Sequence, residues 1–325
     1  MTPYISIVIP VYNEEKTLPI MFGRLIPVMD AYGKPYEVIF VNDGSKDGSQ
    51  KVLAELFNKR PDVIRVVQFM RNYGQHPAIM AGFEHVRGEV VVTLDCDLQN
   101  PPEDIPKLLK LIEEGHDVVG GIRADRQDLA WRKAASRFSN IVRKYITNIN
   151  MTDHGCMLRA YRRHIVDQIV ECGDASPFIT ALSQSLAANP TEIEVGHEER
   201  AAGESNYNLY KLIRYNFDLM TGFSLVPLQL FTIIGMALSA ASLLLVVYMI
   251  LRRIFVGPEA EGVFTLFAIM FFLISVTMTG LGIVGEYVGR IYMEVRKRPR
   301  YMVKQVLEKD SSPFAKASGD KGFGR

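Results

Sequence analysis

The sequence predicts an α/β domain with a mostly parallel sheet, followed by a two-helix transmembrane hairpin. Strand and helix patterns alternate over residues 1–125, which is typical of parallel strands joined by connecting helices. Polar or glycine-rich clusters follow the predicted strands, and sheets of this kind bind their ligands at the carboxyl ends of the strands. Residues 228–251 and 263–285 carry no charge, and each stretch is long enough to cross a bilayer at roughly 20 residues per crossing.

The alternating elements can be placed one by one. Apolar runs predict strands at residues 5–10, 37–42, 63–69, 90–94 and 118–121. Helical patterns predict connections at residues 15–32, 50–58 and 77–86. The second predicted strand ends in Asp43-Gly44-Ser45 and the fourth ends in Asp95-Cys96-Asp97, so both acidic clusters fall at the same edge of the sheet.

Asp95 and Asp97 have the clearest chemical meaning. Two carboxylates one residue apart suit a hard divalent cation that is also held by diphosphate oxygens. Such triplets occur by chance in many loops, and Asp43 taken alone belongs to an ordinary turn. The combination of these acids at neighbouring strand ends indicates a nucleotide-type site.

The two uncharged stretches predict a helical hairpin with both chain ends on one side of a membrane. The loop that joins them, residues 252–262, holds two basic residues. More basic residues flank the outer ends of the hairpin: Lys211, Arg214, Arg290, Arg296, Lys297, Arg298, Arg300 and Lys304. The positive-inside rule therefore places both termini in the cytoplasm. The alternative, two buried helices of a soluble protein, is disfavoured by their length and lack of charge.

Composition disfavours several other classes. The 37 basic and 36 acidic residues nearly balance, so no nucleic-acid partner is expected. Cys96, Cys156 and Cys172 lack the spacing of metal ligands and are interpreted as reduced thiols. Pro3 and Pro10 interrupt the first apolar stretch, so no signal peptide is expected at the amino terminus.

Several motifs together carry a family resemblance. Pro10, Tyr12-Asn13-Glu14, Asp43, Asp95 and Asp97 resemble the nucleotide pocket of the inverting family-two glycosyltransferases with the A-type fold, over residues 5–206. Residues 71–76, residues 95–102 and the two apolar stretches are similar to the polyprenyl-phosphate glycosyltransferases within that family. A narrower resemblance, to the members that transfer 4-deoxy-4-formamido-L-arabinose to undecaprenyl phosphate, rests on three segments: 153–163, 261–264 and 285–292.

The resemblance implies a UDP-sugar donor, an undecaprenyl phosphate acceptor and Mg²⁺ or Mn²⁺ as cofactor. It implies Asp95, Asp97 and Gln99 as metal ligands, with Asp95 alternatively contacting the ribose. A larger set is implied to bind the donor or a phosphate group: Pro10, Tyr12, Glu14, Asp43, Arg71, Asp95, Arg123, Arg126, Arg137 and Ser205. Arg123, Arg126 and Arg137 could each equally belong to a solvated basic face.

The catalytic residues implied by the resemblance are Asp153, Asp97 and Arg200. Asp153 could act as a base or could orient the acceptor phosphate, whose second pKa near 6 already makes much of it a dianion. It could instead cap a helix at residues 156–170. Arg200 belongs to a segment similar to the family's mobile loop, where this chain has Asn206 in place of the usual lysine.

We therefore expect a cytoplasmic catalytic domain at residues 1–206 and an interfacial amphipathic helix at 207–225. Transmembrane helices occupy residues 226–290, and residues 291–325 form a cytoplasmic tail with a disordered last part. A basic amphipathic helix at residues 131–149 fits either a membrane interface or ordinary packing.

The resemblance implies a location in a bacterial inner membrane, contact with membrane lipid and assembly as a homotetramer. The strand-like segment at residues 300–307 could pair between subunits. Its implied role is lipid A modification, which underlies polymyxin resistance. Two alternatives stay open: transfer of glucose or N-acetylhexosamine by the same machinery, and a nonenzymatic scaffold that binds nucleotide.

Overall fold

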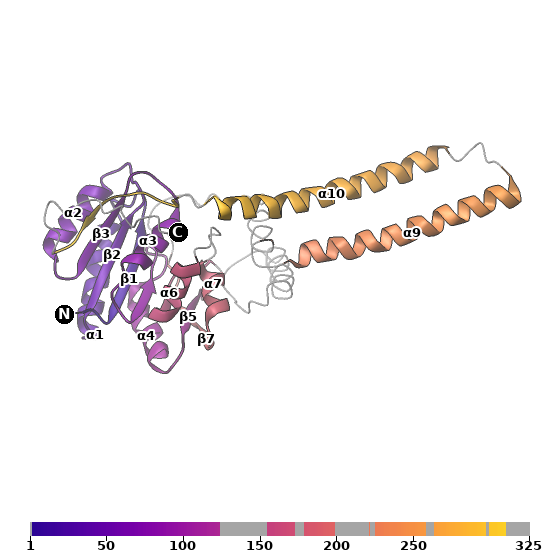
Figure 1. Ribbon diagram of the computed structural model, residues 1–325. Coiled ribbons are helices and arrows are strands. Elements are labelled where there is room, and N and C mark those ends of the chain that lie inside the picture. The colour runs from indigo at the N-terminus through magenta and orange to yellow at the C-terminus, as the bar shows by residue number, and fades with distance from the viewer. Residues whose placement is uncertain are drawn as a thin grey trace, which may run out of the picture. The chain divides into compact units, whose positions relative to one another are not determined.

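The computed structural model describes residues 2–123, 155–172, 179–198, 221, 225–257, 263–296 and 299–309 (Figure 1). The chain divides into two compact units. In the described part, the first unit holds the sheet and its helices, and the second holds two long helices.

The first unit is built on an eight-stranded sheet with the order β7-β5-β6-β4-β1-β2-β3-β8. The neighbours β4-β1-β2-β3 are parallel, as is the pair β5-β7, whereas β6 and β8 are antiparallel to their neighbours. The strands are β1 (Ile5–Val11), β2 (Tyr36–Asn42), β3 (Ile64–Phe69), β4 (Val90–Thr93), β5 (Val118–Arg123), β6 (Arg159–Arg162), β7 (Pro190–Val195) and β8 (Val303–Leu307).

Helices cover both faces of this sheet, so the central strands are apolar on both sides. In β1, Ile7 and Ile9 belong to one buried cluster with Leu25 of α1, whereas Val8 belongs to a second cluster with Phe83 of α3. The helices of this unit are α1 (Leu18–Tyr32), α2 (Ser49–Lys59), α3 (Gln75–His85), η1 (Pro102–Asp104), α4 (Ile105–Glu113), α6 (Arg163–Cys172) and α7 (Ile179–Leu186).

The predicted α/β fold with a mostly parallel sheet is confirmed, and each of the five predicted strands is present. The prediction of a helix at residues 156–170, which Asp153 would cap, is wrong. Arg159–Arg162 forms β6, which pairs with both β4 and β5, and α6 begins only at Arg163. Asp153 itself lies outside the described residues.

The segment after the second long helix is also more than a tail. Residues Val303–Leu307 form β8, which pairs with β3 of the same chain (Figure 1). The pairing between subunits expected for residues 300–307 stays a prediction. Beyond the strand, Glu308 forms ion pairs with Arg65 at 3.0 Å and with Arg87 at 2.6 Å. The sheet of the first unit therefore includes chain from both ends of the sequence.

The second unit contains α9 (Val226–Val256) and α10 (Val263–Val295). Within them, Leu228–Val256 and Ile269–Met293 are long and apolar enough to cross a bilayer, which confirms the predicted pair of spans. Gly280 lies against the Phe231 ring, where a Cβ atom would come within 2.0 Å of the ring carbon Cζ. The predicted helix at 131–149, nearly all of the segment 207–225 and the last fifteen residues lie outside the described part of the chain.

Candidate functional site

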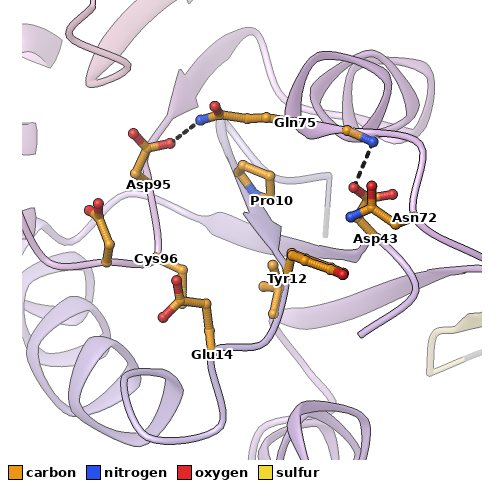
Figure 2. Close-up of a pocket in the computed structure, with 11 residues that line it drawn as sticks. Pro10, Tyr12, Glu14, Asp43, Asn72, Gln75, Asp95 and Cys96 are labelled. Atoms are coloured by element: carbon orange, nitrogen blue, oxygen red, sulfur yellow. Dashed lines mark hydrogen bonds between the residues drawn. The ribbon is translucent and has the colours of Figure 1, made fainter. Parts of the chain in front are cut away.

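A cavity of about 280 Å³ opens at the carboxyl ends of the parallel strands (Figure 2). The loops after β1, β2, β3 and β4 each contribute to it, because neighbouring parallel strands end at the same edge of the sheet. The described residues that line it are Pro10, Val11, Tyr12, Glu14, Asp43, Asn72, Gly74, Gln75, Asp95, Cys96 and Asp97. The sequence-predicted acids Asp43, Asp95 and Asp97 are thus brought together.

Asp43 is the buried anchor of one side of this pocket, with 2% of its surface exposed. Its Oδ1 accepts a hydrogen bond from the backbone N–H of Tyr73 at 2.6 Å, and its Oδ2 accepts one from Gly74 at 2.8 Å. Burial raises the pKa of the Asp43 carboxyl, and the two backbone donors oppose that rise. The carboxylate therefore joins the loop after β2 to the loop after β3.

Gly44 lets these two loops approach each other closely. Its φ is +64°, a left-handed conformation that glycine adopts without steric cost. A Cβ atom at this position would lie 2.3 Å from the carbonyl carbon of Arg71. Arg71 is exposed and does not line the pocket, and its guanidinium lies 5.0 Å from the centroid of the Tyr73 ring.

The two acids after β4 are held by different contacts. Asp95 Oδ1 accepts a hydrogen bond from Gln75 Nε2 at 2.5 Å, as Figure 2 shows. Asp97 Oδ1 accepts one from the backbone N–H of Gln99 at 3.1 Å. Leu98, between Asp97 and Gln99, has a φ of +63°. This value is uncommon for a residue other than glycine and indicates a turn held by its surroundings.

Gln99, predicted as a metal ligand, does not line the pocket in the described part of the chain. Its backbone N–H is directed to Asp97, and its carbonyl oxygen accepts a hydrogen bond from the Glu198 N–H at 2.9 Å. The contacts of Gln99 therefore support the loop that carries Asp97.

Cys96, between the two acids, is 3% exposed and also lines the pocket. Burial raises the pKa of its thiol, so the thiol stays protonated. Its Sγ lies 3.8 Å from Thr17 Oγ1, and that hydroxyl donates a hydrogen bond to Glu14 Oε2 at 2.5 Å. Thr17 thereby links the loop after β1 to the loop after β4.

The pocket has the donor chemistry of a magnesium or manganese site that substrate completes. No group of three or more metal-binding side chains occurs in the described ranges. Asp95 and Asp97 supply hard carboxylate oxygens to one cavity, and Mg²⁺ is commonly held by one or two carboxylates together with substrate phosphates. The residues present fit a cation that binds together with a diphosphate.

His76 follows Gln75 at the start of α3 and is neutral near pH 7. Its Nδ1 is buried without a hydrogen-bond partner, and burial lowers its pKa from 6.5 to about 4. The unfolded chain therefore binds a proton more readily than the folded chain between those two values, and the free energy of unfolding falls as the pH is lowered from 6.5 to about 4.

The His76→Gln variant is expected to lose part of this pH dependence, because glutamine does not titrate. The measurement is the denaturant midpoint of wild type and variant from pH 7.5 to pH 4. An equal fall of the denaturant midpoint with pH in the two proteins would show that His76 does not contribute to the loss of stability in acid.

Residues 6–170 match the family described as Glycosyl transferase family 2. The chain belongs to that family. The family match and the mostly parallel sheet confirm the predicted A-type glycosyltransferase fold, and the protein is a glycosyltransferase.

Several relatives of this family 2 glycosyltransferase carry one name, undecaprenyl-phosphate 4-deoxy-4-formamido-L-arabinose transferase. The protein from Serratia proteamaculans is 48% identical over 305 residues, covering 93% of this chain and 94% of its own length. The protein from Shewanella sediminis is 46% identical, covering 98% of this chain and 96% of its own length. The protein from Salmonella heidelberg is 44% identical, covering 97% of this chain and 97% of its own length.

Solved structures with a similar fold include glucosyl-3-phosphoglycerate synthase from Mycobacterium tuberculosis. Its complex with UDP has a TM-score of 0.49 and 19% identity, covering 68% of this chain and 79% of that chain. Its complex with Mn²⁺, UDP-glucose and phosphoglyceric acid has a TM-score of 0.47 and 18% identity, covering 68% of this chain and 78% of that chain.

The remaining sequence-predicted residues of the family 2 glycosyltransferase comprise one that the structure describes and five that lie outside its described ranges. Arg123 ends β5 and is absent from the described lining residues. The others lie outside the described residues: Arg126, Arg137, Asp153, Arg200 and Ser205. Sequence reasoning missed the roles of Gln75 and Thr17, whose only sequence signal was their nearness to predicted strand ends.

Proposed function

We propose that this family 2 glycosyltransferase transfers 4-deoxy-4-formamido-L-arabinose from UDP to undecaprenyl phosphate with inversion at the sugar. The pocket that joins Asp43 to Asp95 and Asp97 is the observation that carries the proposal, because it combines a buried acceptor group with a site for a metal–diphosphate. The sugar and the lipid acceptor follow from the name shared by relatives that are 44–48% identical to the chain.

Asp43 recognises the nucleoside in this proposal. Each of its oxygens accepts one backbone hydrogen bond, and a carboxylate oxygen has a second lone pair that can accept from a uracil imide or a ribose hydroxyl. Tyr12, 41% exposed at the pocket, offers a ring face beside the base. Pro10 and Glu14 complete the wall on that side.

Asp95 and Asp97 would hold the Mg²⁺ or Mn²⁺ ion beside the diphosphate. When bound, the ion would neutralise the negative charge that develops on the leaving UDP. Gln75, which donates to Asp95, keeps that carboxylate oriented before the donor arrives. Asp95 alternatively contacts the ribose, and Asp97 is the firmer ligand in our proposal.

The acceptor needs little activation, since a phosphate monoester with a second pKa near 6 is largely a dianion at cytosolic pH. Asp153 is proposed to orient this phosphate or to remove its last proton. Arg200, Arg126 and Arg137 are proposed to contact the diphosphate or the lipid phosphate, because a guanidinium matches phosphate geometry.

The proposed location is a bacterial inner membrane. The spans Leu228–Val256 and Ile269–Met293 anchor the protein beside its lipid acceptor. Basic residues outside the hairpin favour cytoplasmic termini and a cytoplasmic catalytic domain. Assembly as a homotetramer and a role in lipid A modification, with polymyxin resistance as its consequence, complete the proposal.

The test is sugar transfer by purified full-length protein with undecaprenyl phosphate and Mg²⁺ or Mn²⁺, with lipid products identified by mass. UDP-4-deoxy-4-formamido-L-arabinose, UDP-glucose and UDP-N-acetylglucosamine are offered separately. We expect a glycolipid from the formamido sugar alone. A product from glucose or N-acetylglucosamine alone would contradict the proposed donor, and UDP binding without any transfer would favour a nonenzymatic scaffold.

A further inference from the structure

The loop after β3 connects the pocket to a segment far away in the sequence. Residues 70–74, here called the 70–74 loop, contribute Asn72 and Gly74 to the pocket. On the pocket side, the loop is held by the two backbone hydrogen bonds to Asp43. Met70 of the loop also donates a backbone hydrogen bond to Met302, and Phe69, directly before the loop, stacks on Tyr301.

The contact with residues 301 and 302 begins with an aromatic stack. The rings of Tyr301 and Phe69 lie nearly parallel, with centroids 4.8 Å apart and an interplanar angle of 15°. Phe69, the last residue of β3, is 1% exposed, so its position is set by packing. The Phe69 ring then meets the Tyr73 ring edge to face, with centroids 5.7 Å apart.

Main-chain pairing accompanies the stack. The Met70 N–H donates to the Met302 carbonyl oxygen at 3.0 Å, and Phe69 pairs with Val303 where the β3–β8 register shifts. Met70 itself is 62% exposed, so its side chain adds little packing to hold the loop. The stack and this hydrogen bond therefore tie the start of the loop to the segment that precedes β8.

We propose that Tyr301 is a positioning residue for the donor pocket: through Phe69 and Tyr73 it holds the 70–74 loop so that the Tyr73 and Gly74 amides meet Asp43. The inference rests on the proposed function for the identity of the ligand, a nucleoside diphosphate, and on geometry alone for the positioning. It assigns a role in donor binding to a residue that follows the second membrane helix in the sequence.

The test begins with hydrogen exchange in ligand-free, full-length protein in detergent, followed by mass spectrometry of peptides that cover residues 70–75. Losing an aromatic pair is worth about 0.5–1.5 kcal/mol, so Tyr301→Ala is expected to speed exchange of the Tyr73 and Gly74 amides roughly 2- to 10-fold. Tyr301→Phe keeps the ring and should exchange like wild type.

Glu308→Gln is the matched control, since it weakens the ion pairs with Arg65 and Arg87 at the other end of β8. It should lower the melting temperature and leave exchange at residues 70–75 unchanged. Equal acceleration in this control would overturn the proposal, because β8 docking in general would then be responsible. If Tyr301→Ala does not fold, Tyr301→Leu replaces it, and wild-type exchange in that folded variant would also overturn the proposal.

Donor kinetics provide the functional readout. We expect Tyr301→Ala to raise KM for the UDP-sugar roughly 2- to 10-fold, with kcat and KM for the lipid acceptor within about twofold of wild type. A fall in kcat with unchanged donor KM would contradict positioning of the donor pocket. Failure of wild type to transfer the formamido sugar would overturn the proposed function alone, because the exchange experiment needs no ligand.

Discussion

Replacing Asp97 by asparagine is expected to lower kcat/KM for sugar transfer by about 10²- to 10³-fold, since a divalent cation contributes several kcal/mol of charge stabilisation. Asparagine keeps an Oδ1 that can accept the Gln99 N–H, so the turn after β4 is retained while one negative charge is lost. The measurement is the initial rate of transfer across a range of Mg²⁺ and Mn²⁺ concentrations. A shift of the metal dependence to higher concentrations is expected as well.

Glu113→Gln is a suitable control for this loss of charge. Glu113 ends α4 and pairs with Lys34 at 2.6 Å on the surface, so its neutralisation should leave transfer unchanged. Thermal unfolding of both variants shows whether the fold is intact. Activity of the Asp97 variant within about fivefold of wild type would contradict its assignment as a metal ligand.

Gly44→Ala is expected to reduce the free energy of unfolding of the catalytic domain by about 3 kcal/mol or more. A left-handed conformation costs an L-residue about 1–2 kcal/mol, and a Cβ atom 2.3 Å from the Arg71 carbonyl carbon forces backbone to move at further cost. Because the displaced backbone begins the 70–74 loop, UDP affinity should fall as well. Chemical unfolding and calorimetric UDP titration measure the two effects.

Gly33→Ala separates the cost of the left-handed conformation from the cost of the steric clash. Gly33 follows α1 with a φ of +78°, and no atom lies within 4 Å of the position of an added Cβ atom. This variant should lose about 1–2 kcal/mol and bind UDP like wild type. Equal losses in the two variants would show that the loops after β2 and β3 are less tightly packed than the structure indicates.

The sequence carried strong signals for β1 to β4, because each is a mainly apolar run that is buried over most of its length. It carried weak signals for β6 and β7. Arg159–Arg162 has an arginine at each end, and Pro190–Val195 contains two glutamates, so only pairing with neighbouring strands makes them part of the sheet. Local pattern cannot reveal a strand that is defined by its partners.

In the candidate site, too, some features have a local sequence signal and others depend on contacts between distant residues. Asp43, Asp95 and Asp97 could be predicted because acids after buried strands end at one edge of a parallel sheet. The contact of Gln75 with Asp95 could not, since it joins the start of α3 to the loop after β4 through side-chain geometry. Gln99 was predicted as a metal ligand from the family resemblance, yet it is its backbone N–H that contacts Asp97.

The place of β8 in the sheet sets an order of events during synthesis. β3 ends at Phe69, but the strand that covers its edge is complete only at Leu307, after both membrane-spanning helices have been made. At typical rates of translation this interval is on the order of ten seconds or more. An uncovered edge strand can pair with other chains, so the open edge of β3 is exposed to aggregation throughout this interval. Completion of the sheet thereby follows synthesis of both candidate membrane spans.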